Sequence, residues 1–269
     1  MNPDDGRLKS HATKILALIP ARMGSSRFPG KPMAALLGVP MIEHVYRRVA
    51  LNPTVTATVV ATCDAEIADH MGSIGGRVAM TGHHHERASD RCAEALEKIE
   101  RQDAVRFDIV VMVQGDEPMV HPEMISEAIA PMLVDPAILI TNLLGRISGD
   151  AEFEDRNCIK VVCDRNSDAL YFSREPIPTR AKGVNAPMGK QICVIPFRRQ
   201  FLTDYTQMAP TPLEIAESVD MMRVLENGLK VRMVPTRYDS QSVDTESDRS
   251  RVEQLLRRDV LQRQLFGGR

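Results

Sequence analysis

The sequence lacks an excess of charge of either sign. Its 269 residues include 34 Lys and Arg against 36 Asp and Glu, which gives a formal net charge of -2. A balanced chain has no broad cationic field to attract the phosphates of DNA or RNA, so we expect no nucleic acid as a partner. Any anion must instead be bound by a local cluster of cationic side chains.

Long apolar runs are missing as well. The longest ones are far shorter than a membrane span requires. No segment combines the charged start, apolar centre and small-residue end of a signal peptide. We therefore expect no contact with a membrane.

Cysteine is scarce and scattered. The five cysteines form no Cys-x-x-Cys pair; they are Cys63, Cys92, Cys158, Cys163 and Cys193. An odd, dispersed set argues against a disulfide scaffold or a structural zinc site and favours the reducing cytoplasm. Since free cysteine packs as a small apolar side chain, we expect these residues to be buried.

Short apolar runs alternate with helical patterns in the first half of the chain. One such helical pattern is Met41–Ala50, and the runs that favour buried strands are Ile15–Ile19, Thr56–Thr62, Ile109–Gln114 and Ile138–Leu144. Continuous apolar strands separated by helices are typical of an α/β fold with a doubly wound, mostly parallel, Rossmann-like sheet.

The pattern changes after about residue 150. Strand candidates there are Ile159–Cys163, Gln191–Ile195 and Lys230–Val234, and helical patterns cover Leu213–Glu226 and Glu246–Gln264. We expect residues 1–14 to be a flexible tail and residues 15–269 to form a single domain. A smaller lobe for an acceptor or for dimerisation would be inserted at about residues 165–225.

A cationic loop follows the first apolar run. The stretch "IPARMGSSRFPGKP" spans Ile19–Pro32, and five residues separate Gly24 from Gly30, whereas a Walker A loop needs four. The dinucleotide fingerprint G-x-G-x-x-G is also absent, which disfavours a dehydrogenase. The alternatives are a solvated basic turn and a different kind of anion site. Because ligands bind beyond the carboxyl ends of parallel strands, the position favours the anion site.

The side chains of this loop suit phosphate oxygens. Arg22 and Arg27 offer planar forks, Lys31 adds a point charge, Ser25 adds a hydroxyl donor, and Gly24 lets the backbone approach a ligand closely.

Carboxylates occur at two further points of interest. Asp116 lies in "QGDEP" at the end of a buried strand, where it could cap a turn or bind a cation. Asp244 lies just before the C-terminal helical pattern and could cap that helix, as Thr245 also could. Two acids from distant segments would suit Mg²⁺, which typically takes one or two protein carboxylates.

The histidine tract His83–His85 is a weaker metal signal. Three adjacent histidines cannot face one ion from a regular helix or strand, so a loop or helix start is favoured. Ser89 or Asp90 is expected to cap the helix that follows.

Five stretches together resemble the 3-deoxy-manno-octulosonate (Kdo) cytidylyltransferases. They are "IPARMGSSRFPGKPMAALLGVPMIEHVYRRV", "MVQGDEPMVHPEMI", "ALYFSREPIP", "APTPLEIAESVDMMRVLENG" and "SVDTESDRSRV". The resemblance implies a cytoplasmic, homodimeric, magnesium-dependent enzyme that joins CMP from CTP to a small acidic acceptor and releases pyrophosphate.

The resemblance also implies roles for individual residues. Catalytic roles fall to Arg22, Lys31, Asp116 and Asp244, with Asp116 and Asp244 as the magnesium ligands. Nucleotide contacts fall to Ala21, Gly24, Ser25, Arg27, Asp90, Arg91 and Gln114. Acceptor contacts fall to Arg174, Glu214 and Glu217, which match the family, and to position 191, which is Gln191 here. Lys190 is a further acceptor candidate, because with Arg174 it could hold the anionic group of a phosphonate. No residue stands out as a general base.

The acceptor half departs from the pattern of the family. Gln191 replaces a histidine, Ile195 replaces a tyrosine, and Ile215 stands where glutamine is common. Because an unmatched buried polar group is costly, such changes can alter which acceptor fits. The acceptor is therefore Kdo or a related 2-keto-3-deoxy sugar acid, or alternatively another acid such as a small phosphonate. A nucleotide-binding protein without turnover is a further alternative.

Overall fold

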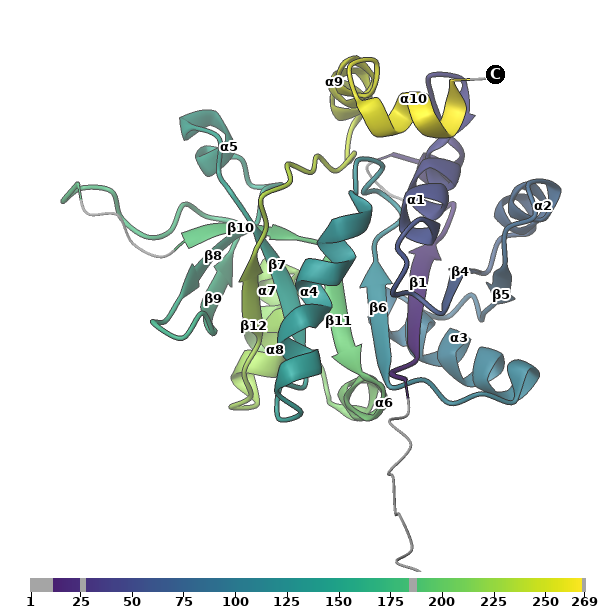
Figure 1. Cartoon of the computed structure of the whole chain (residues 1–269). Coiled ribbons are helices and arrows are strands. Elements are labelled where there is room, and N and C mark those ends of the chain that lie inside the picture. Colours follow the sequence, from purple (N-terminus) through teal and green to yellow (C-terminus); the bar gives the residue numbers. More distant parts are fainter. Residues whose placement is uncertain (1–11, 25–27, 184–187, 268–269) are drawn as a thin grey trace, which may run out of the picture.

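Two five-stranded sheets lie side by side in the computed structural model, which describes residues 12–24, 28–183 and 188–267 (Figure 1). The strands of the first sheet are β1 (Ile15–Ala21), β4 (Ala57–Thr62), β5 (Val78–Met80), β6 (Ile109–Val113) and β11 (Val194–Arg198). Their order is β11-β6-β1-β4-β5, and only β11 runs antiparallel to its neighbour. This sheet confirms the mostly parallel α/β fold predicted from the sequence.

Helices cover both faces of the first sheet because its strands are apolar on both faces. All seven residues of β1 are buried; Leu16 and Leu18 face one cluster of helices, whereas Ala17 and Ile19 face the other. One face is covered by α1 (Met41–Ala50), α2 (Ala65–Ser73) and α4 (Pro122–Val134). The other is covered by α3 (Ala88–Asp103) and α6 (Arg199–Gln207).

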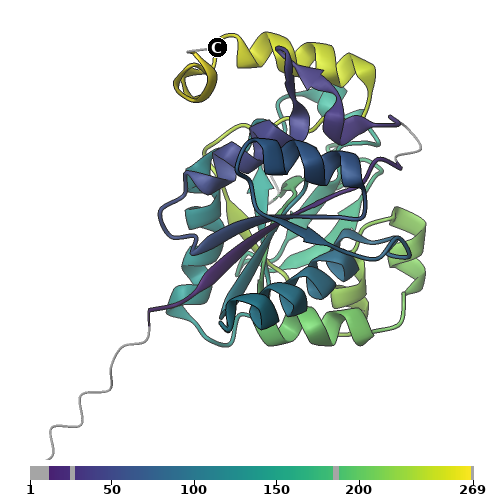
Figure 2. The same ribbon diagram turned by 90° about the vertical axis from the view of Figure 1, so that its right-hand side faces the viewer.

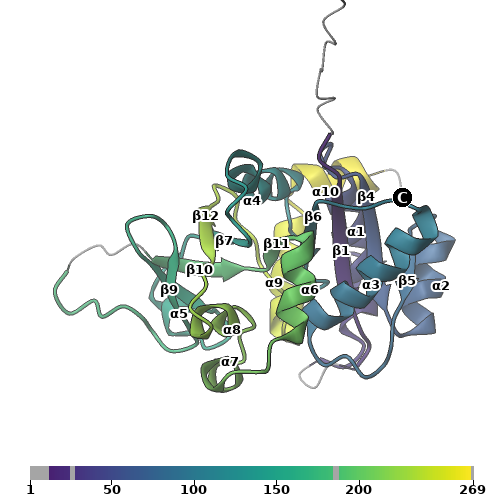
Figure 3. The ribbon, with the colours of Figure 1, turned by 90° about the horizontal axis from the view of Figure 1, so that it is seen from below.

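The second sheet is mainly antiparallel and takes its strands from residues 141–235. They are β7 (Thr141–Gly145), β8 (Lys160–Cys163), β9 (Ala169–Ser173), β10 (Met188–Ile192) and β12 (Arg232–Pro235). Their order is β12-β7-β10-β8-β9, with β12 parallel to β7. The short helices associated with this half are α5 (Asp150–Glu154), α7 (Pro212–Glu217) and α8 (Met221–Glu226). Figure 3 shows α7 and α8 beneath the second sheet.

The C-terminal helices return to the first half of the chain. The elements in this region are the 3-10 turn η1 (Lys31–Met33), the hairpin β2 (Ala35–Leu36) and β3 (Val39–Pro40), and the helices α9 (Glu246–Leu256) and α10 (Val260–Phe266). Figure 2 shows the hairpin beside these helices. Leu36 packs with Val252 and Leu256, and the Leu37 N–H donates to Glu253 Oε1 at 2.9 Å. These contacts hold the segment before α9 close to the loop after β1.

The prediction of a single strand at Gln191–Ile195 is wrong, because the chain passes from one sheet to the other within this segment. β10 ends at Ile192 in the second sheet and β11 begins at Val194 in the first. The Cys193 carbonyl between them accepts the Gln114 N–H at 3.1 Å. A continuous apolar run does not reveal which sheet each half will join.

Two expected helices are also interrupted. The helix Leu213–Glu226 ends after α7, where Ser218 adopts a left-handed conformation with φ of 52°. The helix Glu246–Gln264 ends after α9, and Asp259 begins a new one because its carboxylate accepts the Leu261 N–H at 3.0 Å. The amphipathic pattern of the sequence continues across both breaks. The pattern alone therefore cannot show where each helix ends. In the described part of the chain, no helix combines the length and apolarity needed to cross a bilayer.

Candidate active site

A cavity of about 1200 Å³ lies beyond the carboxyl ends of β1 and β6 and extends to β10 in the second sheet. It collects residues from segments that are far apart in the sequence. Among the residues expected from the sequence, the cavity is lined by Ala21, Arg22, Gly24, Lys31, Arg91, Gln114, Asp116, Arg174, Lys190, Gln191 and Asp244. Ser25 and Arg27 lie outside the described residues.

The loop after β1 is shaped by backbone contacts at its base. The Gly30 N–H donates to the Met23 carbonyl at 3.0 Å, and Gly30 has φ of 73°, a conformation that favours glycine. Gly115 follows β6, and a side chain there would meet the Pro20 carbonyl at 3.0 Å. The loops after β1 and β6 can therefore approach each other closely.

Lys31 lies between the two predicted metal ligands. Its Nζ is 2.6 Å from Asp116 Oδ2 and 3.2 Å from Asp244 Oδ1. Burial alone would lower the pKa of Lys31, but the charges of Asp116 and Asp244 raise it above its ordinary value. The lysine is thus a protonated cation shared by two carboxylates. This geometry shows that Asp116 and Asp244 can converge on one positive charge, and oxygen donors of this kind suit Mg²⁺.

Two backbone features bring these acids together. The Val243 N–H donates to the Asp116 carbonyl at 3.0 Å, which ties the segment before α9 to the turn after β6. Thr245 is the N-cap of α9, and its side chain accepts the Asp248 N–H at 3.2 Å. Because Thr245 takes the capping role, the side chain of Asp244 is not needed for it.

Glu117 is a buried acid in the wall of the cavity. It is 5% exposed, its Oε2 accepts the Ser240 hydroxyl at 2.6 Å, and its Oε1 accepts the Cys193 N–H at 3.5 Å. Burial, together with the neighbouring charge of Asp116, raises the pKa of Glu117 to about 7. Glu117 therefore joins the turn after β6 to the crossover between the sheets. In the sequence, the only indication that Glu117 belongs to the site is its position next to Asp116.

The start of α3 differs from the expectation. Arg87 is the N-cap residue, so Ser89 and Asp90 lie inside the helix and do not cap it. Ser89 instead donates to Asp220 Oδ2 at 3.2 Å. Arg91 lines the cavity, and its guanidinium donates to Thr81 Oγ1 at 2.5 Å, while Asp90 is not among the lining residues that the structure describes.

The histidine tract does not form one cluster. His83 lies near Cys63 and Asp64, while His84 and His85 lie near Glu94. The tract is in the turn between β5 and α3, as the sequence predicted for a loop or helix start.

The far end of the cavity contains the acceptor candidates on β10. Lys190 Nζ pairs with Glu152 Oε1 of α5 at 2.5 Å, and the Gln191 amide donates to Asn142 Oδ1 at 2.7 Å. Ile195 also lines the cavity and is 2% exposed. Arg174 lines it too, although its guanidinium donates to the Glu217 carbonyl at 2.6 Å.

The other acceptor candidates lie elsewhere. Glu214 is fully buried and forms a two-pronged pair with Arg223, with Nη2 to Oε1 at 2.6 Å and Nε to Oε2 at 2.7 Å. The Glu217 carboxylate accepts the Arg174 N–H at 2.8 Å. Neither acid is among the described lining residues, and Ile215 is 63% exposed on α7. Both acids are used instead to pack α7 against its neighbours. A sequence motif alone cannot distinguish this structural role from contact with a substrate.

Comparisons with known proteins agree on one family. A family model described as "Cytidylyltransferase" matches residues 16–231. A 3-deoxy-manno-octulosonate cytidylyltransferase of Geobacter metallireducens is 44% identical over 256 residues, covering 91% of this chain and 98% of that protein. A second 3-deoxy-manno-octulosonate cytidylyltransferase, from Solibacter usitatus, is 40% identical over 250 residues, and the match covers 93% of this chain and 97% of that protein.

Solved structures give the same answer for the fold. A CMP:2-keto-3-deoxy-manno-octonic acid synthetase complexed with CTP has a TM-score of 0.83 and 35% identity, covering 91% of this chain and 99% of that one. A cytidylyltransferase from Leptospira borgpetersenii has a TM-score of 0.61 at 17% identity, and the match covers 92% of this chain and 88% of that one. At this low identity the likeness supports only the shared fold.

Proposed function

The chain belongs to the cytidylyltransferase family, and on that premise we propose that it transfers CMP from CTP to Kdo and releases pyrophosphate. Two observations support this reaction. The curated relatives that cover nearly the whole chain carry this activity in their names. The observation that carries the proposal is the convergence of Lys31, Asp116 and Asp244 in the same cavity that the loop after β1 and the acceptor candidates on β10 line.

The loop after β1 provides the nucleotide side of the reaction. Arg22 and Lys31 would hold the phosphates of CTP and stabilise the negative charge that develops as pyrophosphate leaves. Arg27 and Ser25 are expected to add to this cradle. Gln114 would contact the nucleotide from the turn after β6. Most of the rate would come from positioning and charge stabilisation.

Asp116 and Asp244 would hold the divalent metal, which we propose is Mg²⁺. When bound there, Mg²⁺ would polarise the α-phosphate and lower the pKa of the attacking hydroxyl. Lys31 would then exchange its contacts with the two carboxylates for contacts with the phosphates.

The acceptor side would use Lys190, Gln191 and Arg174. An acceptor oxygen attacks the α-phosphorus, the bond to pyrophosphate breaks, and the hydroxyl proton leaves to solvent. Lys190 is a buried ammonium with one carboxylate partner at 2.5 Å, so it is placed to attract the carboxylate of a sugar acid in exchange for Glu152. Gln191 and Arg174 would orient the acceptor.

We also propose a cytoplasmic homodimer that associates through the second sheet. The edge strand β9 carries Leu170, which is 61% exposed, and α7 beside it carries Ile215. Tyr171 of β9 donates to Glu217 of α7 at 3.1 Å, so the two exposed residues belong to adjacent elements. Light scattering of the L170D variant would reveal a monomer if this face joins the subunits.

The function is tested by a pyrophosphate-release assay with purified protein. CTP is paired in turn with Kdo, with other 2-keto-3-deoxy sugar acids and with small phosphonates, each with Mg²⁺ and with a chelator. We expect turnover with CTP and Kdo that needs the metal. Turnover with a phosphonate alone would favour the alternative acceptor, and CTP binding without any turnover would favour a nucleotide-binding protein.

A matched pair of variants tests the acceptor end of the cavity. Lys190→Ala should raise the KM for Kdo while leaving the KM for CTP nearly unchanged. Glu152→Gln removes the partner of the same lysine and keeps the lysine itself, so it should not raise the KM for Kdo. An equal increase in both variants would mean that the ion pair serves only the fold.

A further inference from the structure

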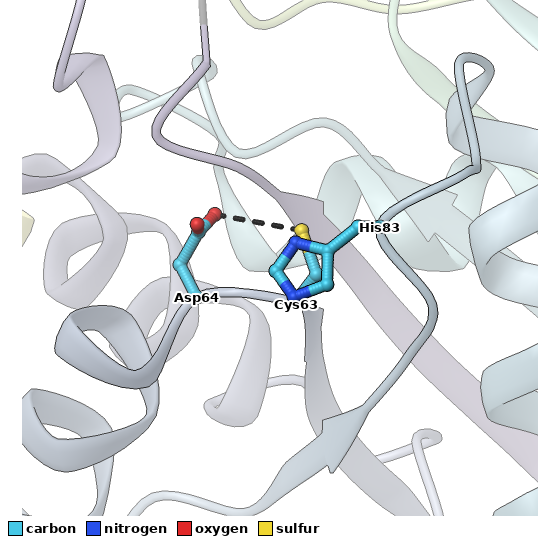
Figure 4. Close-up of side chains that lie close together, drawn as sticks. All are labelled: Cys63, Asp64 and His83. Carbon is cyan, nitrogen blue, oxygen red and sulfur yellow. Dashed lines mark hydrogen bonds between the residues drawn. The ribbon is translucent and has the colours of Figure 1, made fainter.

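Three side chains of different metal-ligating types meet outside the cavity (Figure 4). Cys63 and Asp64 follow β4 directly, and His83 lies in the turn after β5. The register of these parallel strands places Thr62 beside Met80, so residues just beyond the two strands are brought close together. The ligand atoms of the three side chains all lie within 4.8 Å of one another.

The distances suit a tetrahedral ion. Cys63 Sγ and Asp64 Oδ2 are 3.6 Å apart. In a tetrahedral zinc site, bonds of about 2.3 Å to sulfur and about 2.0 Å to oxygen place these two ligand atoms about 3.5 Å apart. The first two ligands are therefore already at the required separation. His83 is exposed, so its side chain can adjust to complete the set without disturbing the core.

We propose that Cys63, Asp64 and His83 form a Zn²⁺ site, with water as the fourth ligand. A thiolate combined with an imidazole selects Zn²⁺ over Mg²⁺ or Ca²⁺, which prefer oxygen ligands. Binding would release the thiol proton of Cys63 to solvent, so zinc affinity should increase with pH in the range where the free thiol is protonated. The site does not depend on the proposed acceptor.

The site is connected to the loop that binds the nucleotide phosphates. The Met23 N–H donates to Asp64 Oδ2 at 2.8 Å, and Met23 lies between two residues that line the cavity, Arg22 and Gly24. A carboxylate has enough lone pairs to accept this hydrogen bond and bind a metal at once. Zinc at Asp64 would thus hold the first turn of the loop in place.

A second cluster on the same turn provides a control. Glu94 is already engaged by Lys98 Nζ at 2.7 Å and by the Gly82 N–H at 2.9 Å, and it also contacts His85. Its oxygens therefore serve an ion-pair network. His84, which lies near Glu94, is exposed, like His83, but is not part of the proposed zinc site.

The test is a zinc titration of the full chain after removal of metals with a chelator. Excess Mg²⁺ is present to saturate Asp116 and Asp244, and zinc affinity is measured by competition with a chromophoric chelator. We expect one Zn²⁺ per chain. Cys63→Ser and His83→Ala should each weaken binding by at least about 100-fold, because loss of outer-shell partners alone costs 10–100-fold. His84→Ala should bind zinc as the unmodified chain does.

Cobalt substitution adds a spectroscopic signature. The Co²⁺ form should show a thiolate-to-cobalt charge-transfer band and the visible bands of tetrahedral Co²⁺, and Cys63→Ser should lose the first. The proposal is overturned if the chain binds zinc no better than Cys63→Ser does. It is also overturned if His84→Ala, in place of His83→Ala, loses zinc, or if the cobalt form lacks the thiolate band. Thermal unfolding of His83→Ala confirms that the variant is folded.

Discussion

Glu214 provides a sharp test because a contact with the acceptor and a role in folding predict opposite results. Its two carboxylate oxygens accept hydrogen bonds from Arg223 at 2.6 and 2.7 Å, and neither side chain is more than 4% exposed. The same arginine donates to the Met208 carbonyl at 3.2 Å, and its guanidinium lies 4.7 Å from the centre of the Tyr205 ring. Glu214→Ala would leave a buried guanidinium without its carboxylate.

The expected cost follows from that loss. Breaking a buried ion pair by removing one partner costs about 3–5 kcal/mol. In a domain of this size each kcal/mol lowers Tm by about 2–4 °C, so Tm should fall by about 6–20 °C. The KM for the acceptor should change little in the protein that remains folded, because Glu214 is not among the described residues that line the cavity.

Thermal unfolding and steady-state kinetics below the lowered Tm measure the two effects separately. The double variant Glu214→Ala with Arg223→Met removes both charges and should recover much of the lost stability, since the unpaired charge is the main penalty. An unchanged Tm together with a large increase in the KM for the acceptor would refute the structural role.

Three further predictions concern catalysis, pH and backbone strain. Asp116→Asn should nearly abolish pyrophosphate release while leaving Tm close to that of the unmodified chain; unaffected turnover would contradict the metal assignment. Burial alone would raise the pKa of Glu94, but hydrogen bonds from Lys98, the Gly82 N–H and His85 lower it from 4.5 to about 2. Its stabilising effect is therefore present above pH 4.5 and lost as the pH falls toward 2. In denaturant titrations, the unfolding free energies of Glu94→Gln and the unmodified chain should differ at pH 6 and converge near pH 2. Ala104 ends α3 with φ of 50°, so Ala104→Gly should stabilise the fold by up to about 1 kcal/mol, seen as a higher Tm.

Much of the first half of the fold could be predicted from the sequence because its signals are local. The strands predicted at Ile15–Ile19 and Ile109–Gln114 correspond to β1 and β6, and apolar runs of this kind are typical of strands buried on both faces. The helix Met41–Ala50 was predicted with the bounds that the structure gives it. These elements also placed the loop after β1 and the turn after β6 at one edge of the sheet, where the cavity lies.

The second half could not be predicted as well, because its signals depend on tertiary contacts. Nothing in the run Gln191–Ile195 shows that Cys193 separates two strands of different sheets. Glu214 matches a family motif, but the sequence does not reveal its partner Arg223, because the two meet only through the packing of α7 against α8. In the first half, too, the nineteen residues between Cys63 and His83 conceal their proximity, which arises from the pairing of β4 with β5.

The crossover at Cys193 joins the two sheets through one short stretch of main chain. Gln191 on β10 and Ile195 on β11 are four residues apart on one continuous segment, which spans at most about 14 Å. Hydrogen bonds from the Gln114 N–H to the Cys193 carbonyl and from the Cys193 N–H to Glu117 anchor its midpoint. The two sheets are therefore tied together at this point. We therefore expect that substitutions of side chains on β10 can change the chemistry of this end of the cavity while the main chain that joins the sheets stays in place.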